Sequence, residues 1–176
     1  RSGRIGLTIR HRDDVCSAPA RAGGTGSRLP DPGRVMSNVW DDVPDWGGVG
    51  ALRLDRPGEC ALGASVWELQ PGGENWYHLH HGSEEMVVVL RGTPTLRTPA
   101  GERVLAEGDV VVFPRGPEGA KGLRNESAAA ARVLIASTNV DPDVTEYPDT
   151  GKVGHIVGGE LRVHRAGDAV EHAGPE

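Results

Sequence analysis

The stretch from Gly72 to Gly92 constrains the fold of this chain more than any other segment. Its first half carries the alternate histidines His78 and His80, and its second half contains the apolar run 86–90 after a short polar turn. Successive side chains of an extended strand point to opposite faces, so the two histidines project from one face. The run that follows is rich in β-forming residues. The segment therefore predicts a strand-turn-strand unit with two imidazoles on one face.

Two carboxylates open the second strand of this unit. Glu84 and Glu85 are neighbours, so their side chains face opposite ways and only one of them can join His78 and His80. Two imidazoles about 6.5–7 Å apart along a strand can hold one ion between them. With one carboxylate they form a set that binds a divalent metal and leaves positions open for water, oxygen or substrate. The spacing alone leaves open which glutamate takes part.

The middle of the chain reads as a series of short strands. Glycine, proline, asparagine and aspartate separate them, and no window shows a sustained 3.6-residue apolar period, so helix should be minor. The 26 glycines, 13 prolines and 4% aromatic residues suit a turn-rich β protein. The pattern predicts an all-β sandwich or barrel. Strands are expected at 61–69, 76–80, 85–90, 93–97, 103–105, 109–113, 122–124 and 132–138.

Composition divides the chain into three zones. Residues 1–36 form an N-terminal arm rich in Gly, Arg, Ser and Pro, in which only the island from Ile5 to Ile9 could add an edge strand. Residues 37–138 form the barrel. Residues 139–176 form a C-terminal extension in which the strand pattern loosens, with loops expected near 140–143 and 147–152 and short strands near 153–157 and 161–163.

Length and charge exclude several classes of function. A chain of 176 residues is long enough for one domain with a proper core. The net charge of −6 and the lack of a basic stripe argue against nucleic-acid binding. No apolar stretch approaches 18 residues, so no membrane span is expected and the protein should be soluble and cytoplasmic. Cys16 and Cys60 lie far apart, and free thiols are expected rather than a disulfide.

The motif spacing resembles that of the cupin superfamily. The first cupin motif is Gly, five residues, His-x-His, three or four residues, Glu, six residues and Gly, and it is matched from Gly72 to Gly92. The second motif is Gly, five residues, Pro-x-Gly, a gap, His, three residues and Asn, and it is matched from Gly108 to Asn125 except at its histidine. The resemblance covers roughly residues 50–138. It implies the cupin-type double-stranded β-helix, a jelly-roll barrel. It also implies that the C-terminal extension 139–176 wraps the barrel, as a similar extension does in some small bacterial cupins.

The resemblance also implies a metal site. Its register selects Glu85, rather than its neighbour, as the carboxylate ligand beside His78 and His80. Cupins usually bind a divalent metal, here iron, manganese, zinc or nickel, through three histidines and one glutamate. In this chain the fourth ligand position is occupied by Lys121, with three residues between it and Asn125.

Two interpretations of Lys121 follow. In the first, His78, His80 and Glu85 hold the ion, and Lys121 serves catalysis as a general base or a Schiff-base nucleophile together with Glu85. In the second, the Lys121 ammonium takes the place of the ion and pairs with Glu85, because a fixed cation repels a divalent one. The site would then be metal-free and would bind a small ligand or perform acid/base chemistry.

Other residues are expected to shape a substrate pocket. Trp76 shares the strand face of the two histidines and should point into the barrel beside them. Val87 and Val89 should form an apolar wall on the inner face of the return strand. His155 could supply a missing ligand from the C-terminal extension, and Arg115 could reach a substrate carboxylate. A solvated surface position is the simpler interpretation of both.

The sequence therefore favours an enzyme. We expect a divalent-metal-dependent oxygenase, isomerase or lyase, hence an oxidoreductase or an isomerase/lyase, that acts on a small organic molecule in the barrel. The alternative is a metal-free cupin that binds a small ligand. The resemblance further implies a homodimer, because cupins often pair through barrel edges and exchanged N-terminal strands, for which Ile5 to Ile9 could serve.

Overall fold

The computed structural model describes residues 37–55 and 61–168. The predicted arm 1–36 with its apolar island, both cysteines and the residues from 169 onward lie outside the described residues. Twelve strands and two short 3-10 helices, η1 (Pro117–Gly119) and η2 (Ala166–Asp168), make up the described part. This part contains no α-helix, as the lack of a 3.6-residue period predicts. Within it, no helix could cross a bilayer.

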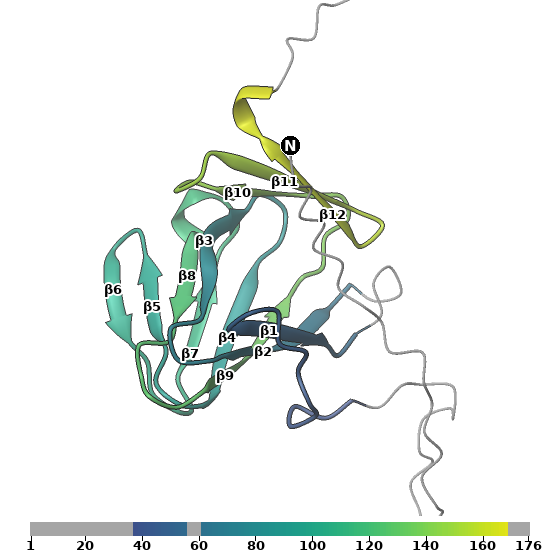
Figure 1. Ribbon diagram of the computed structural model, residues 1–176. Helices are drawn as coiled ribbons and strands as arrows, with labels where there is room; N and C mark the ends of the chain where they lie inside the picture. The colour runs from purple at the N-terminus through teal and green to yellow at the C-terminus, as the bar shows by residue number, and fades with distance from the viewer. Residues whose placement is uncertain (1–36, 56–60, 169–176) are drawn as a thin grey trace, which may run out of the picture.

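The strands form two antiparallel sheets (Figure 1). The first has the order β1-β2-β9-β4-β7, and its strands are β1 (Val49–Arg53), β2 (Gly63–Leu69), β4 (Glu85–Arg91), β7 (Val110–Phe113) and β9 (Ala131–Ser137). The second has the order β12-β11-β10-β3-β8-β5-β6, and its strands are β3 (Glu74–His80), β5 (Thr95–Thr98), β6 (Gly101–Val104), β8 (Lys121–Arg124), β10 (Asp143–Tyr147), β11 (Lys152–Val157) and β12 (Glu160–Arg165). From β2 to β9 the chain passes repeatedly between the two sheets, which confirms the predicted jelly-roll barrel.

The hydrophobic core lies between the facing sheets. Strand alternation turns Val87 and Val89 of β4 inward, where both are buried. They pack with apolar side chains from both sheets, which excludes water from the barrel interior. The other core members are Leu69, Leu96, Leu105, Phe113, Leu123, Val133 and Ile135.

The motif residues outside the site have structural roles. Gly72, Gly92, Gly108 and Gly116 have φ between 79° and 86°, a left-handed conformation that favours glycine at turns. The Asn125 side chain is 1% exposed. Its amide donates to the carbonyls of Leu69 (2.9 Å) and Ala129 (2.8 Å), and its oxygen accepts from the backbone and hydroxyl of Ser127. Asn125 therefore fixes the turn before β9.

All eight strands expected between residues 61 and 138 are present, with no end shifted by more than two residues. Two further strands, β1 and β10, were missed by the sequence analysis, which placed a loop at the start of β10. The reason is visible in β10, whose buried positions are the polar side chains of Asp143 and Thr145. A strand that buries polar residues lacks the apolar alternation by which strands are recognised.

Candidate metal centre

Three potential metal ligands meet at one end of the core, between β3 of one sheet and β4 of the other. The Nε2 atoms of His78 and His80 lie 4.0 and 3.6 Å from the carboxylate oxygens of Glu85. One donor atom from each residue lies within 4.8 Å of the others, so the group could hold a metal ion. Glu84 is exposed. The structure thus brings together the three residues that the motif register selects.

Hydrogen bonds at Nδ1 fix both imidazoles. His78 Nδ1 lies 2.7 Å from the Trp76 carbonyl oxygen, which can only accept, so this nitrogen carries the proton. His80 Nδ1 lies 2.7 Å from Asp143 Oδ2, a carboxylate oxygen that also accepts. In the neutral form each ring therefore has its lone pair on Nε2, the nitrogen that approaches Glu85. Such outward hydrogen bonds orient histidine ligands in metal sites.

Asp143 was missed by the sequence analysis, although it holds His80 in place. It is the first residue of β10 and is 2% exposed. Its Oδ1 accepts from the backbone amides of Gly82 and Val144, each at 2.8 Å. Burial alone would raise the pKa of Asp143, but hydrogen bonds from His80 and Gly82 outweigh it and hold the pKa at about 2. The carboxylate is therefore ionised at neutral pH and accepts the His80 proton.

Lys121 occupies the fourth side of the group. It lies opposite His78 in the β3–β8 pairing, is 4% exposed, and its ammonium forms an ion pair with Glu85 Oε2. Burial opposes ionisation of Glu85, but the charge of Lys121, followed by His80 and His78, lowers its pKa. Burial and Lys121 lower the pKa of His78 to about 4, so this ring is neutral at pH 7, as a metal ligand must be.

The donor set fits a divalent ion. Metal-nitrogen and metal-oxygen bonds of about 2.0–2.2 Å allow two donors on one ion to be at most about 4.4 Å apart, and both histidine-glutamate distances satisfy this limit. Two imidazoles and one carboxylate suit several first-row metals. An ion here would share Glu85 with the Lys121 ammonium, and the two cations would repel each other.

Tyr147 was also missed by the sequence analysis. The last residue of β10, it places its ring 5.9 Å from the His78 ring. Burial and the nearby Glu85 charge raise the pKa of Tyr147, so its phenol keeps its proton at neutral pH. Tyr147 also lines a groove of about 520 Å³ that none of the three donors lines. Tyr147 therefore borders both the donor group and this groove.

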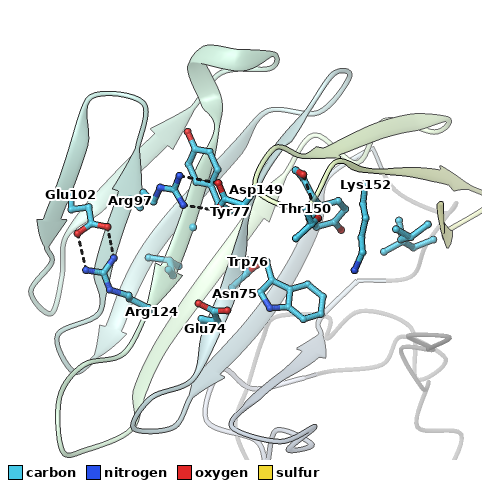
Figure 2. Close-up of a pocket in the computed structure, with 15 residues that line it drawn as sticks. Glu74, Asn75, Trp76, Tyr77, Arg97, Glu102, Arg124, Asp149, Thr150 and Lys152 are labelled. Atoms are coloured by element: carbon cyan, nitrogen blue, oxygen red, sulfur yellow. Dashed lines mark hydrogen bonds and ion pairs between the residues drawn. The ribbon is translucent and has the colours of Figure 1, made fainter. Parts of the chain in front are cut away.

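The groove lies where β10, β11 and β12 meet β3, β8 and β5 (Figure 2). Trp76 is 59% exposed and lines it, so the prediction that Trp76 points into the barrel is wrong. The β3–β8 register shifts between Asn75 and His78, and this irregularity breaks the alternation on which the prediction depended. Tyr77 lines the same groove.

The remaining predicted residues have simpler positions. Val87 and Val89 belong to the packed core and are not among the residues that line the groove. His155 is exposed, and its ring stacks on His164 at 4.9 Å between centroids. It does not join the donor group, because β11 lies two strands away from β3. Arg115 is exposed.

Comparison with known proteins agrees with this geometry. Residues 65–137 match a family model described as a cupin domain. A sugar phosphate isomerase of the cupin superfamily from Silicibacter pomeroyi has a similar structure, with a TM-score of 0.63 and 26% identity over 72% of this chain and 82% of that one. A proposed sugar phosphate isomerase from Acidithiobacillus ferrooxidans gives a TM-score of 0.57 and 30% identity over 68% and 80%.

Curated relatives match over a shorter segment. The auxin-binding proteins ABP19b and ABP19a of Prunus persica are each 34% identical over 73 residues, which make up 38% of this chain. The matched segment spans 35% of each of these relatives. Family model, barrel and motif geometry agree with one another, and the chain belongs to the cupin superfamily.

Proposed function

We propose that the protein is a divalent-metal-dependent isomerase of a small hydroxylated substrate, of which a sugar phosphate is the first candidate. The observation that carries the proposal is the convergence of two Nε2 lone pairs on Glu85, with both Nδ1 atoms hydrogen-bonded away from it. Among the oxygenase, isomerase and lyase chemistries that this fold allows, the two structural neighbours named as sugar phosphate isomerases favour the second.

The chemistry of isomerisation assigns roles to the group. Moving a carbonyl between neighbouring carbons requires a base that removes a proton from one carbon and returns it to the next. A bound metal polarises the carbonyl oxygen and makes that proton more acidic. With Glu85 as a ligand, Lys121 Nζ is the nearby group that can carry the proton. After its ammonium has given one proton to solvent, the neutral amine accepts the substrate proton, and the ammonium formed in this way returns it to the neighbouring carbon.

A second candidate has an observation of its own. The buried ion pair between Lys121 and Glu85 already satisfies the carboxylate charge without a metal. In that case the pair itself serves as acid and base, or holds the charged end of a ligand, and His78 and His80 only shape the site. The two candidates differ in whether a metal is needed.

The test is elemental analysis of the wild-type protein and of Lys121→His and Lys121→Met. Each protein is supplied separately with iron, manganese, zinc and nickel and then desalted. The metal-dependent proposal expects about one ion per chain in the wild type, with little gain in occupancy for Lys121→His. A wild type that retains no metal, while Lys121→His retains one ion, would instead establish that the lysine excludes the ion.

Activity is tested on the same samples. A panel of pentose and hexose phosphates is incubated in heavy water, and exchange of the proton next to the carbonyl is followed by NMR. The metal-dependent proposal expects exchange in the metal-loaded wild type and its loss in Lys121→Met with the ion retained. Exchange that is equal with and without metal would support the metal-free candidate.

A further inference from the structure

The groove bordered by Tyr147 has the size of a small-molecule site. Its volume of about 520 Å³ falls within the range of about 300–1,000 Å³ typical of ligand pockets. Its walls come from two parts of the chain, the barrel strands β3, β5 and β8 and the C-terminal strands β10 to β12 (Figure 2). His78, His80 and Glu85 do not line it, so a ligand here would be distinct from one at the donor group.

One end of the groove is apolar. The Trp76 indole is 59% exposed, Val163 is 48% exposed, and Leu161 lines the groove with them. An indole is a large rigid surface, and leaving it uncovered forgoes the free energy that its burial would provide. Flat rings stack favourably on such a surface. This end therefore suits a planar apolar ring.

The charges of the groove are nearly all paired. Arg97 forms two hydrogen bonds to Asp149, at 2.5 and 3.0 Å, and stacks on the Tyr77 ring at 4.0 Å. Arg124 forms two hydrogen bonds to Glu102, at 2.5 and 2.7 Å. These guanidinium groups are committed to carboxylates of the protein and have little capacity for an anionic ligand.

Lys152 is the exception. Its ammonium lies 5.9 Å from the centre of the Trp76 ring, and within the described part of the chain it has no carboxylate within ion-pair distance. The remaining carboxylate of the groove, Glu74, lies opposite Arg124 in the β3–β8 pairing. Figure 2 shows it on the other side of the indole from Lys152. Among the described residues, the groove thus offers one ammonium without a carboxylate partner beside one exposed indole.

We infer that this groove binds a small planar aromatic carboxylate, with its ring on Trp76 and its carboxylate on Lys152. A single ammonium matches a single negative charge, whereas a phosphate with two charges would need the arginines that are already paired. The aliphatic side chains of Leu161 and Val163 cover the edge of the ring. This site goes beyond the proposed isomerase activity and does not depend on it.

The test uses isothermal titration calorimetry with 2-naphthoate as the probe. The uncharged 2-naphthalenemethanol has the same ring and serves as the matched ligand. We expect saturable one-to-one binding of the carboxylate. Lys152→Gln should weaken it about five-fold, because a partly exposed charge pair contributes modestly, and Lys152→Arg should restore most of the affinity. Trp76→Ala should weaken it about ten-fold or more.

Controls separate this site from the metal centre. Arg115→Gln, an exposed change outside the groove, should leave the affinity unchanged, and metal occupancy should be the same in all four variants. The inference is overturned if the wild type does not bind 2-naphthoate, if the alcohol binds equally well, or if Lys152→Gln and Trp76→Ala leave the affinity unchanged. None of these results alters the metal analysis on which the proposed isomerase depends.

Discussion

The two halves of the metal centre have different origins in the chain. His78, His80 and Glu85 come from a single strand-turn-strand unit. Strand alternation puts the two histidines on one face, and the packing of the two sheets brings Glu85 of β4 opposite them. Lys121 and Asp143 come from β8 and β10, which flank β3 in the second sheet. The first half supplies the donor atoms, whereas the second half sets the orientation of His80 and the charge beside Glu85. Residue spacing within one segment thus predicts which side chains can bind a metal. The pairing of β3 with β8 and β10 determines how His80 is oriented and which charge lies beside Glu85.

The largest loss of metal affinity is expected from a change in the first half of the metal centre. Glu85→Gln removes the only carboxylate of the donor group, so we expect metal affinity to fall by more than about 100-fold, beyond the 10- to 100-fold typical of outer-shell changes. Competition with a chromogenic chelator measures the affinity. Glu84→Gln, the exposed neighbour, is the matched control and should bind like the wild type. Equal losses in the two variants would contradict the assignment of Glu85.

A smaller loss of metal affinity is expected from a change at Asp143, in the second half of the metal centre. Asp143→Asn places an amide donor against His80 Nδ1, which moves the ring proton to Nε2 and removes the lone pair that faces Glu85. Metal affinity should fall about 10- to 100-fold. The control is Glu146→Gln. Glu146 lies on β10 like Asp143, and its exposed carboxylate pairs with His81, which is not one of the three donors. If Asp143→Asn binds as tightly as the wild type while remaining folded, the orienting role of Asp143 is wrong.

The smallest effect is expected from a change at Asn125 in the second motif, and it should alter only the stability of the fold. Asn125→Ala leaves the carbonyls of Leu69 and Ala129 without their side-chain donor, so we expect a loss of about 2 kcal/mol or more in the free energy of unfolding. Asn125→Asp keeps the size but loses the same donors and should be similarly destabilised. Urea denaturation measures both. An unchanged midpoint in both would contradict the structural role of Asn125, in contrast to Lys121 four residues earlier.

Much of the barrel could be predicted from the sequence because its strands alternate apolar and polar residues between clear turns. The two histidines were predictable for a similar reason, since His78 and His80 alternate on one strand, whereas Glu85 was selected over Glu84 by the resemblance to the cupin motif. Asp143 and Tyr147 were not predictable, because their importance arises only when β10 pairs with β3. Their own strand buries polar side chains, which hides it from any pattern of hydrophobicity.

Trp76 shows that the alternation of side chains along a strand can fail to predict where a residue points, even beside a motif. Two residues before His78, it should share the face of that histidine, yet a register shift between β3 and β8 turns it to the groove. Such irregularities depend on the partner strand and leave no clear local signal. The same shift brings the indole near Lys152, a residue more than seventy positions away. The groove therefore could not be predicted from either segment alone.

The most direct test of the central claim is X-ray absorption spectroscopy of the wild-type protein loaded with zinc and desalted. The account predicts retained zinc with two imidazole ligands at about 2.0–2.1 Å and additional oxygen ligands. Zinc that is lost on desalting, or a spectrum without imidazole scattering, would contradict a metal centre at His78, His80 and Glu85. It would leave the ion pair between Lys121 and Glu85 as the functional unit of the site.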